Sequence, residues 1–560
     1  MVGSPRIVGC ATALILFLPD AAVSRPAQAA PADVVRVPQV VAAQAPKAAV
    51  VGASTDLVGT GFTVLDAADT AVLTGTLVDV PGDPSPWAHA ALADFSAVDD
   101  AGTYTVVVGA VESSPVVVQA TPYRAVLTSL LGIFDANADG RESSSLHAPS
   151  HLHDARSRVR NGPDQGRSIN VSGGWMDAGD QLKFTVTIAH ATTLLQLAAR
   201  NEPRLAKKLN TVANVGVSWL RRAHPTDRIF VAQVGDTDAD HNRGFRDPTR
   251  DDRSANMLLK RRPSLVLTPG TGGVDVAAGA ATALALAAKR ATGGKRRTLA
   301  RAAKEWFAKA RALRGPWKNC CYQQDTVNDD LAAAAVELWR TTGNGTYRDL
   351  ALDWLKAVTG NGSRGWRVAM DGYEMAGLPA AELCGVLGAG PPQRASIRNQ
   401  ACRILRAGGN DAVFNAGTNA FGRAGPVTWG TVRQNQNGSL IALLAGRAGL
   451  SGAYTVAHRA LGWFLGANPW GVRFQAGYGV RHPYHWAQLQ GPALPRGSVV
   501  GGPAAKDVID DNYAGPPIAL GPHDTADAVY RDVADDYVTN EVGINYSAGS
   551  VLLLALLSPS

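Results

Sequence analysis

Charged residues, cysteines and aromatic residues are all scarce in this sequence. Of its 560 residues, 18% are charged, 6% are aromatic and 5 are cysteines. The net charge of +7 is modest for this length, and the basic residues lie among acids, so we expect no nucleic-acid partner. After the N-terminal segment, no apolar run is long enough to span a membrane, and we expect no membrane partner.

The N-terminus has the pattern of a secretory signal peptide. Arg6 supplies positive charge, residues 7–18 form an apolar run, and residues 27–29 (Ala-Gln-Ala) fit a small-residue cleavage site. We therefore expect residues 1–29 to be a signal peptide and the protein to be secreted into the extracellular space.

Four cysteines remain once Cys10 leaves with the signal. An even number in an exported protein favours disulfides, and zinc is the alternative, although no Cys-x-x-Cys or nearby His pattern supports it. The adjacent residues Cys320 and Cys321 are not expected to pair with each other. They could bond to Cys384 and Cys402, or Cys384 could pair with Cys402.

Hydrophobic periodicity divides the mature chain into two domains. Residues 33–120 contain short β-type runs between turn residues, which is typical of a small Ig-like β-sandwich. Residues 123–560 show a helical period in about a dozen Ala- and Leu-rich segments. Such helices can close in antiparallel pairs into a ring with one loop-lined face. The expected fold is therefore mainly α, with a β-sandwich in front.

The most distinctive stretch is the octet of residues 173–180, Gly-Gly-Trp-Met-Asp-Ala-Gly-Asp. Asp177 and Asp180 are separated only by small residues, so a tight turn could point both carboxylates the same way. The alternative is a loop whose acids cap the following helix, because Asp is a favoured N-cap residue. The octet alone leaves both interpretations open.

A further acid precedes the apolar C-terminal segment. We expect residues 537–557 to form one helix with Glu541 in its first turns. Burial of that helix would raise the pKa of Glu541, as a general acid near neutral pH requires. The alternative is that Glu541 only interacts with its own helix N-terminus. Tyr537 and Asn540 look like orienting groups, which favours the catalytic interpretation.

Long loops hold many of the aromatic side chains, chiefly residues 317–330 and 466–531. Long loops in a compact domain tend to carry function, and aromatic rings can stack on the apolar face of a sugar. The alternative is that these rings only seal the loops.

Several short motifs follow one another along the chain. They are the octet, residues 234–241, 275–278, 329–338 and 465–479, and the segment Asp-Tyr-Val-Thr-Asn-Glu-Val at 536–542. The octet resembles the DAGD signature of glycoside hydrolase family 9, the inverting β-1,4-glucanases, and the last segment resembles its DYxxNEV signature. Residues 33–120 resemble the Ig-like module of some bacterial members. The resemblance implies an (α/α)6 barrel.

The resemblance also implies roles for single residues. Asp180 matches the general base that activates water, Asp177 its partner, and Glu541 the general acid that protonates the leaving oxygen. An inverting enzyme keeps the base and acid carboxyls about 6.5–9.5 Å apart. The expected substrate-binding residues are His485, Tyr537, Trp175 and Trp486.

A calcium ion is a further implication, since some family members bind one beside the segment at 329–331. The acids that could supply oxygen ligands are Asp325, Asp329, Asp330 and Asp371. The alternative is a solvated helix start with acids at its positive end. We expect no cofactor to be required for activity, and any calcium bound here would be structural.

The sequence departs from the family pattern at positions near the substrate. Residues 484–486 read Tyr-His-Trp where the family has His-His-Arg. Met176, Ala333 and Ala534 stand where the family carries Tyr, Trp and Arg. These changes leave hydrolysis expected but the substrate open.

The function expected from these patterns is that of a secreted, monomeric, inverting endo-β-1,4-glucanase acting on a polysaccharide or an oligosaccharide. No cellulose-binding module is recognised, so soluble or amorphous glucan is the expected form of substrate. One alternative is an exo-acting glycosidase on oligosaccharides or amino-sugar polymers. The other is a non-catalytic carbohydrate-binding relative.

Overall fold

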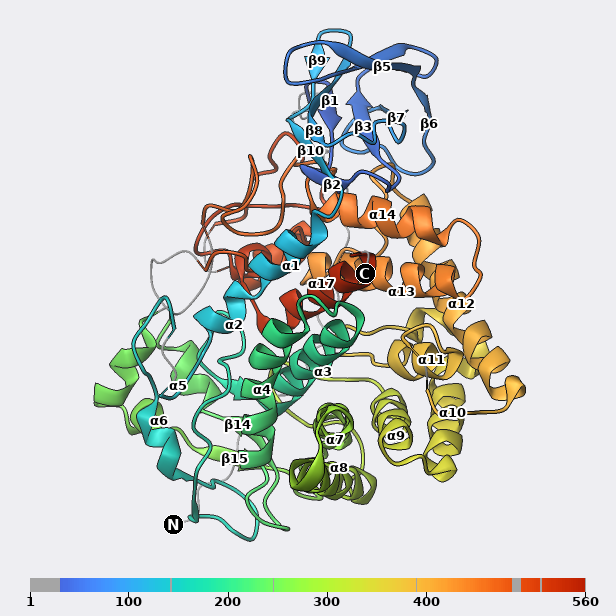
Figure 1. Cartoon of the computed structure of the whole chain (residues 1–560). Helices are drawn as coiled ribbons and strands as arrows, with labels where there is room; N and C mark the ends of the chain where they lie inside the picture. The colour runs from blue at the N-terminus through green and yellow to red at the C-terminus, as the bar shows by residue number, and fades with distance from the viewer. Residues whose placement is uncertain are drawn as a thin grey trace, which may run out of the picture.

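The computed structural model describes residues 31–558, except residues 142–143, 245, 389, 486–494 and 514–515. Figure 1 shows a β-sandwich standing on a ring of helices. The expected signal peptide, residues 1–29, lies outside the described residues, and so does Trp486.

Two sheets form the N-terminal sandwich, as expected. One has the order β1–β3–β7–β6 and the other β2–β10–β8–β4–β5, with β9 paired to β8. In β4 and β8 buried and less buried residues alternate, because successive side chains of a strand point to opposite faces. The strands are β1 Val34–Arg36, β2 Val40–Ala42, β3 Ala48–Ala53, β4 Gly61–Leu65, β5 Ala71–Thr76, β6 Val78–Asp79, β7 His89–Asp94, β8 Gly102–Val108, β9 Val111–Glu112 and β10 Val116–Gln119.

Helix pairs form the second domain, and in each pair one helix is more deeply buried. The deeply buried helices are α3 Thr185–Asn201, α7 Val274–Arg290, α9 Asn328–Thr342, α11 Gly377–Cys384, α13 Thr431–Arg447 and α17 Ile544–Leu557. Their partners, in the same order, are α4 Ala206–Arg222, α8 Gly293–Ala312, α10 Gly345–Thr359, α12 Ala395–Gly417, α14 Ala453–Phe464 and α1 Tyr123–Leu130. Small and apolar residues on nearly every face of the first set explain its position inside the ring.

The ring brings the two ends of the helical domain together. Helix α3 packs against both α7 and α17, α7 packs against α9, and α13 packs against α17. The last long helix therefore lies beside the first inner helix, although they are far apart in sequence. This arrangement confirms the expected α/α barrel.

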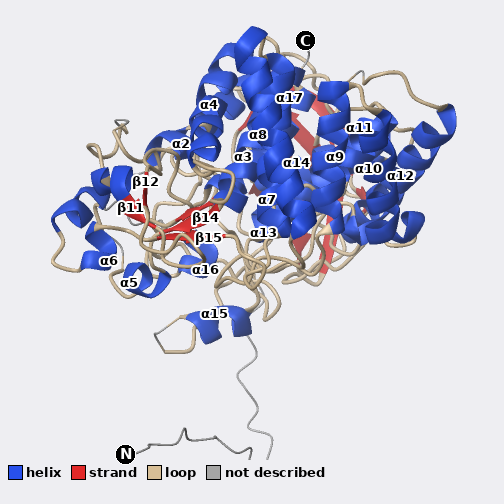
Figure 2. Ribbon diagram, turned by 90° about the horizontal axis from the view of Figure 1, so that it is seen from below, coloured by secondary structure: helices blue, strands red, loops and turns tan. Residues whose placement is uncertain are grey.

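Short elements and loops collect at one side of the helices (Figure 2). A three-stranded sheet has the order β13–β14–β15 and a two-stranded one pairs β11 with β12. The short elements are β11 Ser157–Arg158, β12 Ser168–Ile169, β13 Lys183–Phe184, β14 Val231–Val234, β15 Ser264–Val266, α2 Gly132–Ala136, α5 Thr237–His241, α6 Met257–Lys260, α15 Lys506–Asn512 and α16 Tyr537–Asn540.

The expected single helix over residues 537–557 is wrong, because the chain breaks between α16 and α17. Glu541 ends α16 with an extended backbone, and Gly543 is extended as well. Contacts with distant segments replace the missing helical hydrogen bonds. The Gly501 amide donates to the Glu541 carbonyl at 2.9 Å, and the Ile544 amide donates to the Asp177 carbonyl at 3.0 Å.

The structure contains two disulfides, and one of them contradicts the sequence-based expectation. Cys384 at the end of α11 bonds to Cys402 in α12, which is one of the pairings left open. Cys320 and Cys321 bond to each other, although adjacent cysteines were not expected to pair. The pair lies in a turn where the Asn319 side chain accepts hydrogen bonds from the Cys321 and Tyr322 amides at 2.7 and 2.6 Å.

The sandwich is joined to the barrel by a shared apolar core and by hydrogen bonds. Val40, Val50 and Trp87 of the sandwich belong to the same buried cluster as the barrel helices. The Gln39 side chain donates to the Arg481 carbonyl at 2.9 Å and accepts from the Val480 amide at 2.7 Å. In the described residues, none of the helices combines the length and apolarity needed to cross a membrane.

Candidate active site

The octet starts inside the core and ends at a cavity. Gly174 has a φ of 83°, a left-handed value that favours glycine, and a Cβ there would lie 2.7 Å from the Trp219 ring. Trp175 is 1% exposed and packs edge-on against Phe134 at 5.1 Å. The chain then emerges at Asp177, so the glycines set the direction from which the acids reach the cavity.

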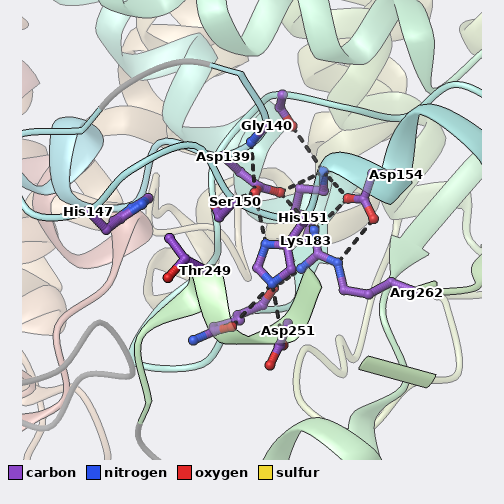
Figure 3. A network of polar contacts seen from close by, with 12 residues as sticks. Asp139, Gly140, His147, Ser150, His151, Asp154, Lys183, Thr249, Asp251 and Arg262 are labelled. Atoms are coloured by element: carbon purple, nitrogen blue, oxygen red, sulfur yellow. Dashed lines mark hydrogen bonds and ion pairs between the residues drawn. The ribbon is translucent and has the colours of Figure 1, made fainter. Parts of the chain in front are cut away.

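A buried network of charges holds both ends of the octet (Figure 3). Lys183 forms ion pairs with Asp139 at 2.9 Å and Asp154 at 2.7 Å, and donates to the Gly173 carbonyl at 3.1 Å. Arg262 pairs with the same two acids and donates to the Gln181 carbonyl. The residues before and after the turn that carries Asp177 and Asp180 are thus fixed by the same cluster.

The electrostatics of this network keep its acids ionised. Burial alone would raise the pKa of Asp139, but Lys183, His151 and Arg262 outweigh it and hold the pKa well below its usual range. The pKa of Asp154 is lowered because Arg262 and Lys183 outweigh burial in the same way. In this network, the buried cations Lys183 and Arg262 are therefore paired with the buried anions Asp139 and Asp154.

Asp177 is a buried residue at the floor of the cavity. Thr187 in α3 donates a hydrogen bond to one carboxyl oxygen, and the Tyr322 hydroxyl donates to the other. Burial, and then the nearby charge of Asp180, raises the pKa of Asp177 to about 8. These two donors fix the orientation of the carboxyl group.

Asp180 lies closer to solvent, and its side chain is 14% exposed. One oxygen contacts His241 Nε2 at 3.3 Å, and the other has no hydrogen-bond partner among the described residues. Burial raises the pKa of Asp180, and the hydrogen bond from His241 opposes that rise. That unpartnered oxygen is itself shielded from solvent, so of the two oxygens only the one beside His241 can contact a water in the cavity.

Glu541 reaches the same cavity from the break between α16 and α17. Its side chain is half-buried, and burial raises its pKa well above the usual range, with Asp180 and Asp177 adding to the rise. Three interacting carboxyls cannot all be ionised easily near neutral pH, so the site retains at least one proton. A retained proton on Glu541 would make it a general acid.

These three acids line one cavity of about 740 Å³. That volume suits a small-molecule or sugar site. Its walls combine carboxyls, aromatic rings and one disulfide. The lining residues are Asp177, Ala178, Asp180, His241, Gly244, Cys320, Cys321, Tyr322, Tyr373, Trp429, Arg433, Asn512, Tyr537, Glu541, Asn545 and Tyr546.

Aromatic side chains form part of the cavity wall. The rings of Trp429 and Tyr537 lie 5.7 Å apart, and the Tyr537 hydroxyl donates to the Asn512 carbonyl. Arg433 lies 4.6 Å from the centre of the Tyr373 ring and forms an ion pair with Asp371 at 2.6 Å. The cavity thus offers ring faces for apolar contact beside groups that can transfer protons.

The structure brings together only some of the residues predicted from sequence. Asp177, Asp180, Glu541 and Tyr537 all line the cavity. The expectation for Trp175 is corrected, because this ring is packed in the core and does not line the cavity. The side chain of His485 is 62% exposed, lies 3.6 Å from Asp532 and does not line this cavity, so its role in substrate binding stays a prediction.

Several cavity residues were not identified as site residues from the sequence. His241 and Tyr322 each contact one of the paired acids. His241 belongs to the family-like segment at 234–241, which was the one available signal. Tyr322 and Trp429 carry no motif, and only the folded chain shows that they line the cavity.

Asn540 does not orient Glu541 directly. Its side chain is buried, accepts from the Tyr530 hydroxyl at 3.0 Å and donates to the Val533 carbonyl at 3.1 Å. These bonds fix the loop that leads into α16, so the effect of Asn540 on the acid is indirect.

The acids proposed as calcium ligands do not fit that ion as they are placed. Asp371 is paired with Arg433 at 2.6 Å, while the side chain of Asp325 is 84% exposed and lies 3.6 Å from Arg367. Asp329 and Asp330 are buried at the start of α9, where one oxygen of Asp329 accepts a hydrogen bond from the Met375 amide at 2.7 Å. Among the described residues, no cluster of three or more His, Cys, Asp or Glu side chains is arranged to hold a metal.

Comparison with protein families gives two matches. Residues 123–554 match the model of glycosyl hydrolase family 9, and residues 30–113 match the cellulase N-terminal Ig-like domain. The first match covers most of the chain.

Curated relatives are similar over much of this chain. Endoglucanase B of Cellulomonas fimi is 28% identical over 435 residues, which cover 72% of this chain and 39% of the relative. An endoglucanase of Dictyostelium discoideum is 26% identical over 478 residues, covering 79% of this chain and 61% of the relative. The chain thus spans less than two thirds of either relative.

Solved structures share the fold. A thermostable endoglucanase mutant from Alicyclobacillus acidocaldarius is 23% identical and superposes with a TM-score of 0.75. The match covers 94% of this chain and all of that one. It includes both the sandwich and the barrel.

Proposed function

Because the chain belongs to glycosyl hydrolase family 9, we propose that it is a secreted endo-β-1,4-glucanase that cleaves glucan with inversion. One observation carries the proposal. Three carboxyls from opposite ends of the helical domain, Asp177, Asp180 and Glu541, line a single cavity and all have raised pKa values. The endoglucanase names of the relatives support the choice of substrate.

Asp180 is the general base in this proposal. Its carboxylate takes a proton from a water as that water attacks the anomeric carbon. His241, at 3.3 Å from one carboxylate oxygen, favours the ionised form of Asp180. Asp177, oriented by Thr187 and Tyr322, helps to hold the water.

Glu541 is the general acid. Burial raises its pKa and so favours the protonated carboxyl, and this proton passes to the glycosidic oxygen as the bond to the anomeric carbon breaks. Burial is the largest cause of the rise in the pKa of Glu541, and the neighbouring carboxyls of Asp180 and then Asp177 add to it. After turnover, Asp180 is protonated and Glu541 ionised, and exchange with water resets both.

Proton NMR of the newly formed anomer tests this reaction. Hydrolysis of a β-glucan by inversion releases the α-anomer first, before mutarotation mixes the two forms. Initial release of the β-anomer would contradict the assignment of Asp180 as a base and require a covalent intermediate.

A second substrate class remains a candidate. Tyr484 and Ala534 stand where the family carries His and Arg, so two residues expected near the substrate are replaced. An exo-acting glycosidase on oligosaccharides or amino-sugar polymers is the second candidate. Product profiles on carboxymethyl-cellulose, mixed-linkage glucan and chitosan distinguish the two, because only an endo-enzyme releases long internal fragments.

Secretion is proposed from the N-terminal signal pattern and agrees with the presence of two disulfides, which form in oxidising compartments. Cell fractionation of the expressing organism tests it. Accumulation of the uncleaved chain inside the cell would contradict it.

A further inference from the structure

The adjacent disulfide Cys320–Cys321 lines the catalytic cavity. Cys320 is exposed and Cys321 half-buried, so the pair forms part of the surface that a ligand meets. The second disulfide is different, because Cys384 is buried where α11 meets α12 and does not line this cavity. One disulfide thus joins helices, while the other forms part of a binding wall.

Neighbouring groups hold the cysteine pair in place. The Asn319 side chain accepts hydrogen bonds from the Cys321 and Tyr322 amides at 2.7 and 2.6 Å. The Tyr373 hydroxyl donates to the Cys321 carbonyl at 3.3 Å, and Thr237 Oγ1 contacts Cys320 Sγ at 3.8 Å. The turn is therefore fixed before any ligand arrives, which reduces the entropy lost on binding.

The pair also lies between the two segments that hold the paired acids. Tyr322, the next residue in the chain, donates to Asp177. Helix α5 contacts Cys320 through Thr237 at its start and Asp180 through His241 at its end. A ligand that touches the disulfide is consequently close to Asp177 and Asp180.

A disulfide offers a particular kind of surface. Sulfur is polarizable and at most a weak hydrogen-bond acceptor, and bonding two adjacent cysteines removes the rotational freedom of both side chains. The result is a small, rigid, apolar face. A β-glucosyl ring has all its hydroxyls equatorial, so each of its faces presents only C–H groups and matches such a surface.

We propose that the Cys320–Cys321 disulfide is a sugar-binding platform, on which the apolar face of a glucosyl unit packs beside the Asp177–Asp180 pair. This inference rests on the proposed function and adds a determinant of substrate choice. A mannosyl ring carries its axial hydroxyl on one of its two faces, and packing on that face would turn a polar group toward sulfur. That hydroxyl would lose water without gaining a hydrogen-bond partner, so the platform selects glucosyl over mannosyl units.

Kinetics of a double variant test the platform. We expect Cys320→Ala/Cys321→Ala to raise KM for cello-oligosaccharides about tenfold, with kcat within about twofold, because packing on a sugar face acts in ground state and transition state alike. The ratio of kcat/KM on glucan to that on mannan should fall as well. The matched control, Cys384→Ala/Cys402→Ala, should leave KM and this ratio unchanged.

A purely structural role predicts a different result. If the disulfide only fixed Tyr322 against Asp177, the double variant would lose kcat while KM and the glucan-to-mannan ratio stayed the same. That outcome overturns the platform. Thermal unfolding of both double variants shows whether either one fails to fold.

A second measurement needs no cysteine substitution. The variant Asp180→Asn is saturated with cellotetraose, with binding confirmed by calorimetry, and is treated with a phosphine reductant and iodoacetamide before peptide mapping. We expect the ligand to slow reduction of Cys320–Cys321 at least fivefold and to leave Cys384–Cys402 unaffected. Equal rates with and without bound ligand overturn the inference.

The two proposals fail in distinguishable ways. Wild-type protein that neither hydrolyses glucan nor binds cellotetraose defeats the proposed function, and the platform with it. Wild-type protein that hydrolyses glucan, while the Cys320→Ala/Cys321→Ala variant keeps its KM and selectivity, defeats the platform alone.

Discussion

At the scale of single residues, the proposed reaction depends on one oxygen of Asp180 and one proton of Glu541. We expect Asp180→Asn and Glu541→Gln each to reduce kcat by at least about a hundredfold, because each removes a proton-transfer group while keeping the shape of the side chain. Reducing-sugar assays measure the loss, and calorimetry with cello-oligosaccharides should show retained binding. Asp325→Asn, at an exposed acid outside the cavity, is the matched control. Wild-type rates in either active-site variant would refute the assignment.

His241 provides a pH-dependent prediction. Its contact with Asp180 opposes the rise in the pKa of that carboxyl, so its removal should raise the pKa further. Ionised Asp180 is the active form, and the acid limb of the kcat/KM profile should therefore move to higher pH by about one unit in His241→Ala. The exposed sandwich residue His89 supplies the control His89→Ala. An unmoved acid limb in His241→Ala would show that His241 does not tune the base.

The sequence was informative where chemistry is encoded in short motifs. Asp177, Asp180 and Glu541 were named from two signatures, and all three line the cavity. Trp175 was named because it stands in the octet, but the left-handed glycines before it turn its ring into the core. Tyr322 and the disulfide were missed because their roles depend on a turn fixed by Asn319, which has no recognisable sequence pattern.

At the scale of elements, the buried network holds the catalytic turn. Lys183→Met leaves Asp139 and Asp154 buried with one cation fewer, and we expect a loss of about 3–5 kcal/mol in the free energy of unfolding. Urea denaturation measures it, with Lys207→Met on the exposed face of α4 as control. A change no larger than that of the control would show that Arg262 alone satisfies both acids.

The same network predicts the response of stability to acid. The pKa values of Asp139 and Asp154 are lower in the folded than in the unfolded chain, where an Asp has a pKa of about 3.9. Their contribution is present above that value and is lost as the pH falls below it, through the folded-state pKa values. Unfolding free energies at pH 7, 5, 4 and 3 should fall most steeply below pH 4, and less steeply in Asp154→Asn than in wild type. Parallel curves for the two proteins would contradict this account.

Element boundaries show what periodicity could and could not predict. The apolar pattern correctly placed the long helices, because each buries a continuous stripe or its whole surface. It merged α16 with α17, since hydrophobic spacing continues across residues 541–543. Hydrogen bonds from Gly501 and to Asp177 stabilise the break, and such distant partners cannot be read from local sequence.

At the scale of the whole molecule, the sandwich supports a barrel loop. Gln39 bonds to the backbone at Val480 and Arg481, so Gln39→Ala leaves two backbone groups without these partners. We expect a loss of about 1–3 kcal/mol in the free energy of unfolding, measured as a lower thermal midpoint. The exposed strand residue Gln119 supplies the control Gln119→Ala. Equal midpoints for the two variants would show that the loop is held without Gln39.

The proposed base and acid lie at opposite ends of the helical domain, on the approach to α3 and just before α17. During translation, Asp180 is synthesised long before Glu541. A nascent chain therefore has no hydrolytic centre, however much of its barrel has already collapsed, and the producing cell is not exposed to activity from unfinished copies. In refolding, catalysis should likewise return only once α17 has docked against α3, because that contact joins distant parts of the domain.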